Sequence, residues 1–154
     1  MNIISEIKHF LETEYSNESL AYLGLTTKIE NPFRDKFAYF LHKKYQNQAR
    51  VSREFSDGRN LRVDLAILTE NEKHFIEFKA CYAFDLVKKD YDLYKKEIIK
   101  DFEKYSDENI SSLTFVLLSI RISDIPDFEK YLHVVKYISS QRASLKKCKS
   151  TENQ

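Results

Sequence analysis

The sequence predicts a single α/β domain with a mixed sheet, and three observations lead to this prediction. Residues 3–45 place their apolar side chains three and four positions apart, which is helical spacing. Residues 48–80 then change to short β-rich runs separated by turn residues. A long helical pattern over residues 84–105 leads into an apolar run over 113–120, as in a helix that connects two parallel strands. The expected order of elements is α-α-α-β-β-β-α-β-α.

Three helices are expected before the sheet. The first runs over residues 3–15, along one apolar stripe. The second is short and is expected to end at Gly24, because glycine commonly follows the last helical turn. The third is expected to use Asn31 as its N-cap and Pro32 as its first helical residue, and to continue to about residue 45.

The sheet is expected to contain four strands. Residues 48–55 and 61–68 form an antiparallel pair around the turn that contains Asp57-Gly58. The third strand covers residues 74–80. The apolar run over 113–120 is expected to be a central strand that is buried on both faces and parallel to the third strand.

The helix between the last two strands is expected to turn a stripe of large apolar residues inward: Val87, Tyr91, Tyr94, Ile98, Phe102 and Tyr105. Pro126 is expected to open a final helix. The chain then divides into an N-terminal helical extension over 1–29, a core over 30–140 and a basic, flexible tail over 141–154.

Composition excludes several classes of protein. With 154 residues, 42% of them hydrophobic and 32% charged, the chain is a folded domain, not a disordered or fibrous one. Only 2 glycines leave no material for a glycine-rich phosphate loop. Cys81 and Cys148 show neither zinc spacing nor a disulfide framework. No signal peptide or apolar span is recognised, so we expect a cytoplasmic protein without membrane contact.

Charge is unevenly distributed, although the net charge is only +1. Residues 28–62 contain 9 basic and 4 acidic residues, whereas 64–130 contain 10 basic and 15 acidic ones. The basic segment has two readings, a solvated surface or a face that meets a polyanion such as DNA. In the second reading it contacts phosphates through Lys43, Lys44, Arg53, Arg59 and Arg62. Lys104, in the acidic half, is expected to have no part in binding.

Two neighbouring strands carry the most informative polar residues. Asp64 interrupts the second strand, and Glu77 and Lys79 share one face of the third, because side chains alternate along a strand. Carboxylates in otherwise apolar strands need a partner, which is either a cation such as lysine or a metal ion. An internal ion pair with Lys79 is therefore one interpretation. A Mg²⁺ site is the other, since magnesium prefers oxygen ligands.

The chain order and these residues resemble the PD-(D/E)XK nuclease superfamily, which has the restriction-endonuclease-like fold with an αβββαβ core. The resemblance covers about residues 30–120, with the signature Val63-Asp64 followed thirteen positions later by Glu77-Phe78-Lys79. Val63 stands where the name-giving proline would stand.

The resemblance implies roles for individual residues. Asp64 and Glu77 would bind Mg²⁺, for which Mn²⁺ is a substitute, and Lys79 would orient or activate the attacking water. Many members also have an acid at the start of the first core helix as a metal or water ligand, which maps to Glu30.

The implied activity is metal-dependent hydrolysis of phosphodiester bonds in DNA, of a bacterial or phage restriction, defence or repair type. A domain of this size that cuts both strands would need a homodimer or a second subunit. The alternative is an inactive subunit that keeps the fold and holds DNA or a protein partner.

Overall fold

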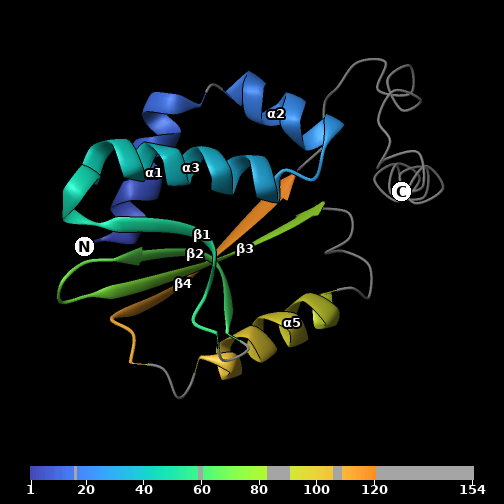
Figure 1. The fold of residues 1–154 in the computed structure, drawn as a ribbon. Helices are drawn as coiled ribbons and strands as arrows, with labels where there is room; N and C mark the ends of the chain where they lie inside the picture. The colour runs from blue at the N-terminus through green and yellow to red at the C-terminus, as the bar shows by residue number, and fades with distance from the viewer. Residues whose placement is uncertain (16, 59–60, 83–90, 106–108, 121–154) are drawn as a thin grey trace, which may run out of the picture.

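A four-stranded mixed sheet lies between two layers of helices, with α1, α2 and α3 on one face and α5 on the other (Figure 1). The computed structural model describes residues 1–15, 17–58, 61–82, 91–105 and 109–120. In chain order the elements are α1 (Ile3–Glu14), α2 (Asn17–Thr26), α3 (Glu30–Tyr45), a short 3-10 helix η1 (Gln46–Gln48), β1 (Arg50–Ser56), β2 (Arg62–Leu68), β3 (Lys73–Tyr82), α5 (Tyr91–Lys104) and β4 (Ser112–Ile120).

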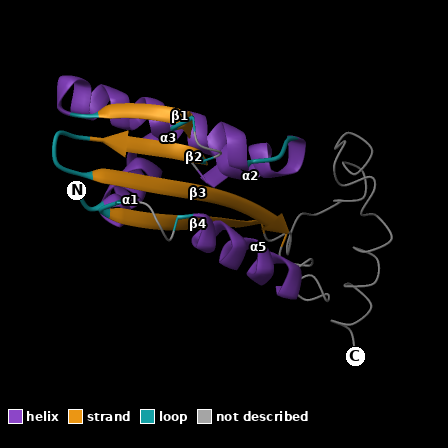
Figure 2. Ribbon diagram, turned by 60° about the horizontal axis from the view of Figure 1, so that its bottom comes forward, coloured by secondary structure: helices purple, strands orange, loops and turns teal. Residues whose placement is uncertain are grey.

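The strands lie in the order β1-β2-β3-β4, which Figure 2 shows. β1 and β2 are antiparallel, as are β2 and β3, whereas β3 and β4 are parallel. The helix between β3 and β4 supplies the crossover that a parallel pair requires. The predicted α/β class, mixed sheet and order of elements are therefore confirmed for the described residues.

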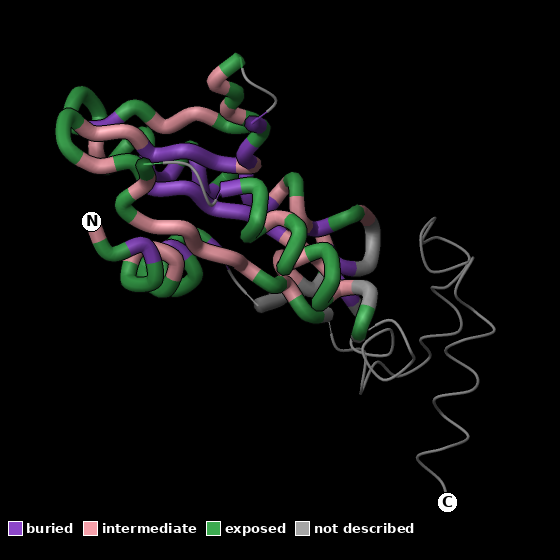
Figure 3. The backbone as a smooth tube through the Cα atoms, turned by 90° about the horizontal axis from the view of Figure 1, so that it is seen from below, coloured by how far each residue is buried: buried purple, intermediate pink, exposed green. Residues whose placement is uncertain are grey.

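Apolar side chains fill both sides of the sheet, and burial is concentrated in its middle strands (Figure 3). On the side of α1 and α3, Phe10 packs against the rings of Phe33, Phe37 and Phe40. α1 therefore contributes to the same core as α3. A second, smaller cluster consists of Leu61, Val63, Ala66, Phe75 and Tyr105, the residue that directly follows α5.

Two predicted helix boundaries differ from the structure. α2 continues through the buried Gly24 to Thr26, since packing offsets the modest cost of glycine within a helix. α3 begins at Glu30, with Ile29 as its N-cap, and not at Pro32. Proline is tolerated in the first turn because the N–H that it lacks would have no partner within the helix.

The predictions for β4 and for one residue of α5 were also wrong. β4 is not central, because it lies at the end of the described sheet beside β3 alone, and its Leu117 is 46% exposed. An apolar run indicates a strand that is covered on both faces but does not give its place in the sheet. Phe102 does not point inward and is 62% exposed.

Other predictions fall outside the described residues: the first part of the helix expected over 84–105, the helix expected from Pro126 and the tail over 141–154. None of the helices in the described part of the chain has the length and apolar character needed to cross a membrane.

Candidate functional site

Asp64 lies at the point where β2 stops pairing with β3. The register runs from Leu68 opposite Lys73 to Leu65 opposite Ile76, and the next cross-strand neighbours in this register would be Asp64 and Glu77. Instead of continuing the ladder, Asp64 accepts a hydrogen bond through Oδ2 from the backbone N–H of Phe78, over 2.8 Å. A side-chain carboxylate therefore takes the place of a backbone carbonyl and stands beside Glu77.

Glu77 is the most deeply buried acid of the site, with 4% of the residue exposed. Its Oε1 accepts hydrogen bonds from Lys104 Nζ, at 3.0 Å, and from the hydroxyl of Tyr105. Burial raises the pKa of Glu77 to about 7, and the neighbouring Asp64 carboxylate raises it as well, while the two donors act in the opposite direction. Glu77 is thus an acid whose negative charge is only partly compensated.

Lys79 lies two residues further along β3 and shares the face of Glu77. Its ammonium group forms an ion pair of 2.8 Å with Asp101 Oδ2. Burial alone would lower the pKa of Lys79, but Asp101 and the nearby carboxylates of Glu77 and Asp64 outweigh it, so that the pKa is raised. Lys79 is therefore a firmly charged group, and its direct partner is neither Glu77 nor Asp64.

The end of α5 supplies three of these contacts. Lys104 and Tyr105 follow Asp101 by three and four residues, so that each lies close to Asp101 at the helix end. The Tyr105 hydroxyl also lies 3.3 Å from the carbonyl oxygen of Arg62. Its pKa is raised by burial and by its bond to the Glu77 carboxyl. Lys104, for which the sequence predicts no part in DNA binding, contacts Glu77 of this site directly.

Sequence reasoning missed Asp101 and Lys104, although a signal was present. Tyr105 belongs to the predicted inward stripe, Asp101 shares its face four residues earlier, and Lys104 lies one turn after Asp101. The rotation of α5 that turns Asp101 toward the sheet also explains why Phe102 is exposed. The inward face follows Tyr94, Ile98, Asp101 and Tyr105, and Phe102 lies about 100° away from Asp101 around the axis.

Glu30 is not brought into contact with Asp64 or Glu77 by any described interaction. Its carboxylate forms an ion pair with Lys28 Nζ at 3.3 Å. Among the residues that the structure describes, no group of three or more His, Cys, Asp or Glu side chains has the arrangement of a metal site. The predicted set of three acids is therefore present as the pair Asp64 and Glu77.

Arg34, one helical turn after Glu30, is the residue of α3 that lies near Asp64. It is buried, with 7% exposed, and donates to Asp35 Oδ1 at 3.0 Å and to Glu54 Oε1 at 3.2 Å. Burial opposes the charge of Arg34, but Asp35, Glu54 and Asp64 together raise its pKa. Sequence reasoning counted Arg34 among the basic residues of 28–62 but did not place it near Asp64.

The basic residues predicted to contact DNA fall into two groups. Arg53 pairs with Asp35 at 2.9 Å and Arg62 with Glu54 at 2.7 Å, so both join the ion pairs of Arg34.

Glu54, which links Arg34 to Arg62, has a φ of 47°, a left-handed conformation that is strained for a residue other than glycine.

The second group, Lys43 and Lys44, lies in the last turn of α3. At a rise of 1.5 Å per residue, Lys43 is about 13 Å along the helix from Arg34. Lys44 pairs with Glu6 at 2.6 Å, and Lys43 lies 3.7 Å from Glu14. Each of the four described basic residues therefore already has an acidic partner. Arg59 lies outside the described residues.

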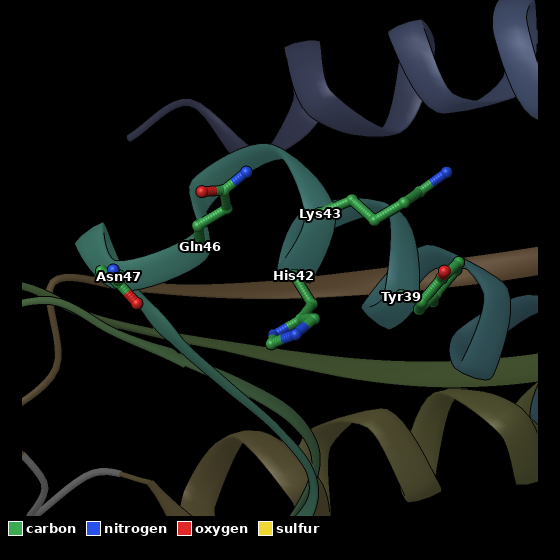
Figure 4. A pocket seen from close by; sticks show the side chains of 5 residues that line it. All are labelled: Tyr39, His42, Lys43, Gln46 and Asn47. Atoms are coloured by element: carbon green, nitrogen blue, oxygen red, sulfur yellow. The ribbon is translucent and has the colours of Figure 1, made fainter.

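Lys43 also borders an open hollow of about 570 Å³, lined by Tyr39, His42, Lys43, Gln46 and Asn47 (Figure 4). The ammonium of Lys43 lies 5.0 Å from the centre of the Tyr39 ring, and Tyr39 is 63% exposed. The hollow contains no acid–lysine constellation of the kind found on β2, β3 and α5, so the latter remains the stronger candidate.

No protein-family model, curated protein or solved structure matches this chain.

Proposed function

We propose that this protein is a metal-dependent nuclease that hydrolyses phosphodiester bonds in DNA. The observation that carries the proposal is the pairing of two acids with a lysine. Asp64 reaches the backbone of β3 next to Glu77, and Lys79 projects from the same face. This combination of two oxygen ligands and a fixed positive charge suits hydrolysis of a phosphodiester.

The pair of acids fits a divalent cation. Burial and the proximity of Asp64 hold the pKa of Glu77 near 7, so that a cation bound between the two carboxylates would relieve both unfavourable effects. Magnesium is commonly held by only one or two carboxylates and keeps several of its waters, so the two acids paired in the described part of the chain are compatible with it. When bound, such an ion supplies Lewis-acid stabilisation and lowers the pKa of a coordinated water.

Lys79 would contribute charge at the reacting phosphate. Its ion pair with Asp101 restricts the ammonium group, and a positioned cation is most effective when it does not have to reorganise during the reaction. The raised pKa keeps Lys79 protonated at neutral pH, so it would act as a charge or a hydrogen-bond donor and not as a base.

Arg53 and Arg62 are the best-placed residues for the flanking phosphates. They are joined through Asp35 and Glu54 to Arg34, which lies near Asp64, and their side chains are 56% and 72% exposed. Binding of DNA would require these arginines to exchange or share their carboxylate partners. Exposed ion pairs contribute little to stability, so this exchange is feasible.

A second candidate is a binding module without catalysis. The ion pairs of Glu77 with Lys104 and of Lys79 with Asp101 favour it, because they satisfy the central charged groups internally. Such a domain would still hold DNA or a protein partner, but Mg²⁺ would have no effect on its function.

The test is cleavage of plasmid, linear duplex, single-stranded and branched DNA with Mg²⁺ or Mn²⁺. We expect metal-dependent cleavage by the wild type, its loss in Asp64→Asn, and normal activity in Asp92→Asn, which makes the same change at an exposed position of α5. Cleavage by Asp64→Asn at the wild-type rate would remove the site from the mechanism. No cleavage of any substrate together with no binding of Mn²⁺ would favour the binding module.

A further inference from the structure

Lys104 places a positive charge directly on the proposed metal ligand. Its Nζ lies 3.0 Å from Glu77 Oε1, and its side chain packs over the ring of Tyr105, with 4.6 Å between the ammonium and the ring centre. The Glu77 side chain is 5% exposed and that of Lys104 30%. The ammonium group thus reaches a buried carboxylate from a partly solvated helix end.

The two lysines of the site have different partners. Lys79 is held by Asp101, which is not one of the two proposed metal ligands. Lys104 is held by Glu77, which is one of them, and so the ammonium group and a metal ion would compete for the same carboxylate. Of the two lysines, Lys104 is therefore the one that metal binding would affect.

The net charge of the site also indicates that metal binding would affect Lys104. With Glu77 ionised, as binding of a metal requires, three carboxylates (Asp64, Glu77 and Asp101) and two ammonium groups (Lys79 and Lys104) sum to −1. A divalent cation would change the sum to +1 if Lys104 stayed in place and to 0 if it moved away. Charges within a partly buried site interact strongly, so the neutral arrangement is favoured.

We infer that Lys104 is an internal counter-ion of Glu77 that is displaced when a divalent cation binds. This inference rests on the proposed function, because it requires that Asp64 and Glu77 bind the metal. The lysine side chain is suited to the movement, since its four-carbon stem is flexible and its ammonium group is strongly hydrated. Lys104 thus stabilises the metal-free site and weakens its affinity for the metal.

The experiment is calorimetric titration of Mn²⁺ into the full-length protein and four variants. Lys104→Met and Lys104→Gln remove the charge, and Lys104→Arg retains it. Lys100→Met is the matched control, because Lys100 is an exposed lysine one turn earlier on α5. We expect Lys104→Met and Lys104→Gln to bind Mn²⁺ about tenfold more tightly than the wild type, as expected for removal of a charge next to a ligand. Lys104→Arg and Lys100→Met should bind within about twofold of the wild type, because the local charge is kept or the lost charge is solvated.

The outcomes separate the inference from the proposed function. If the wild type binds Mn²⁺ and the charge-removing variants bind it no more tightly, the inference is overturned and the metal site stands. An equal gain in Lys100→Met would also overturn it, because the effect would then be a general one of net charge. If neither the wild type nor Lys104→Met binds Mn²⁺, the proposed metal site is overturned, and the inference that depends on it is overturned as well. Binding by Lys104→Met alone would support the inference in its strongest form.

Discussion

The carboxylate of Asp64 accepts a hydrogen bond from the backbone N–H of Phe78, on the neighbouring strand, over 2.8 Å. Phe78 is fully buried, so its N–H requires an acceptor inside the protein. Asp64 supplies that acceptor at the point where the pairing of β2 with β3 ends. The residue proposed as a metal ligand therefore also completes the hydrogen bonding of the sheet.

This double role predicts different results for two substitutions of Asp64. Asp64→Ala leaves the buried N–H of Phe78 unsatisfied, and we expect the free energy of unfolding to fall by about 1–3 kcal/mol. Asp64→Asn keeps an acceptor oxygen and should stay close to the wild type in stability while losing Mn²⁺ binding. Urea denaturation of the three proteins measures the difference. Equal stability of the two variants would show that the hydrogen bond contributes nothing to the sheet.

The raised pKa of Glu77 predicts how stability depends on pH. Its ordinary value is 4.5 and its value in the folded protein is about 7. Between these pH values the folded state keeps a proton that the unfolded state has lost, so the free energy of unfolding falls as the pH rises from 4.5 to 7 and then levels off. Ionised Glu77 thus destabilises the protein at pH 8, by something on the order of 3 kcal/mol.

Glu77→Gln should remove this dependence. We expect the variant to match the wild type near pH 4.5 and to exceed it in stability at pH 8, with no metal present. The difference between the two proteins is measured by urea denaturation at both pH values. A difference that does not change with pH would mean that Glu77 titrates in the folded state as it does in the unfolded chain.

Lys79→Met tests whether the ammonium group serves the reaction or only the fold. If it stabilises charge on the phosphate, we expect the rate of DNA cleavage to fall by about 10²-fold or more while Mn²⁺ affinity stays the same or rises. Single-turnover cleavage and calorimetry measure the two quantities. A lower melting temperature with a normal rate would assign Lys79 a structural role beside Asp101.

Arg62→Ala tests the proposed contact with phosphates. In the inactive Asp64→Asn background we expect DNA affinity to fall steeply with salt, with a log–log slope near −0.9 per phosphate contact. Arg62→Ala should reduce the magnitude of that slope by about 0.9, the value of one phosphate contact, and should lower the affinity for all DNA sequences alike. Fluorescence anisotropy over a series of salt concentrations measures this, and Lys100→Ala is the control on α5. Identical behaviour of the two variants would leave Arg62 as the partner of Glu54 alone.

The order of the elements and the shared face of Glu77 and Lys79 could be predicted from the sequence. Both depend on local periodicity, since side chains repeat every two residues along a strand and about every 3.6 along a helix. The short loop between these antiparallel strands also allowed Asp64 to lie beside Glu77, but the register that brings the two together was decided by the structure.

The partners of these residues were decided by tertiary structure. The pairing of Lys79 with Asp101 and of Glu77 with Lys104 depends on the rotation of α5 against the sheet. That rotation is set by how whole faces of apolar side chains pack, so the apolar pattern alone placed the exposed Phe102 inward and gave no position for Asp101. Periodicity acts over a few residues, whereas these contacts join residues that lie up to 27 positions apart.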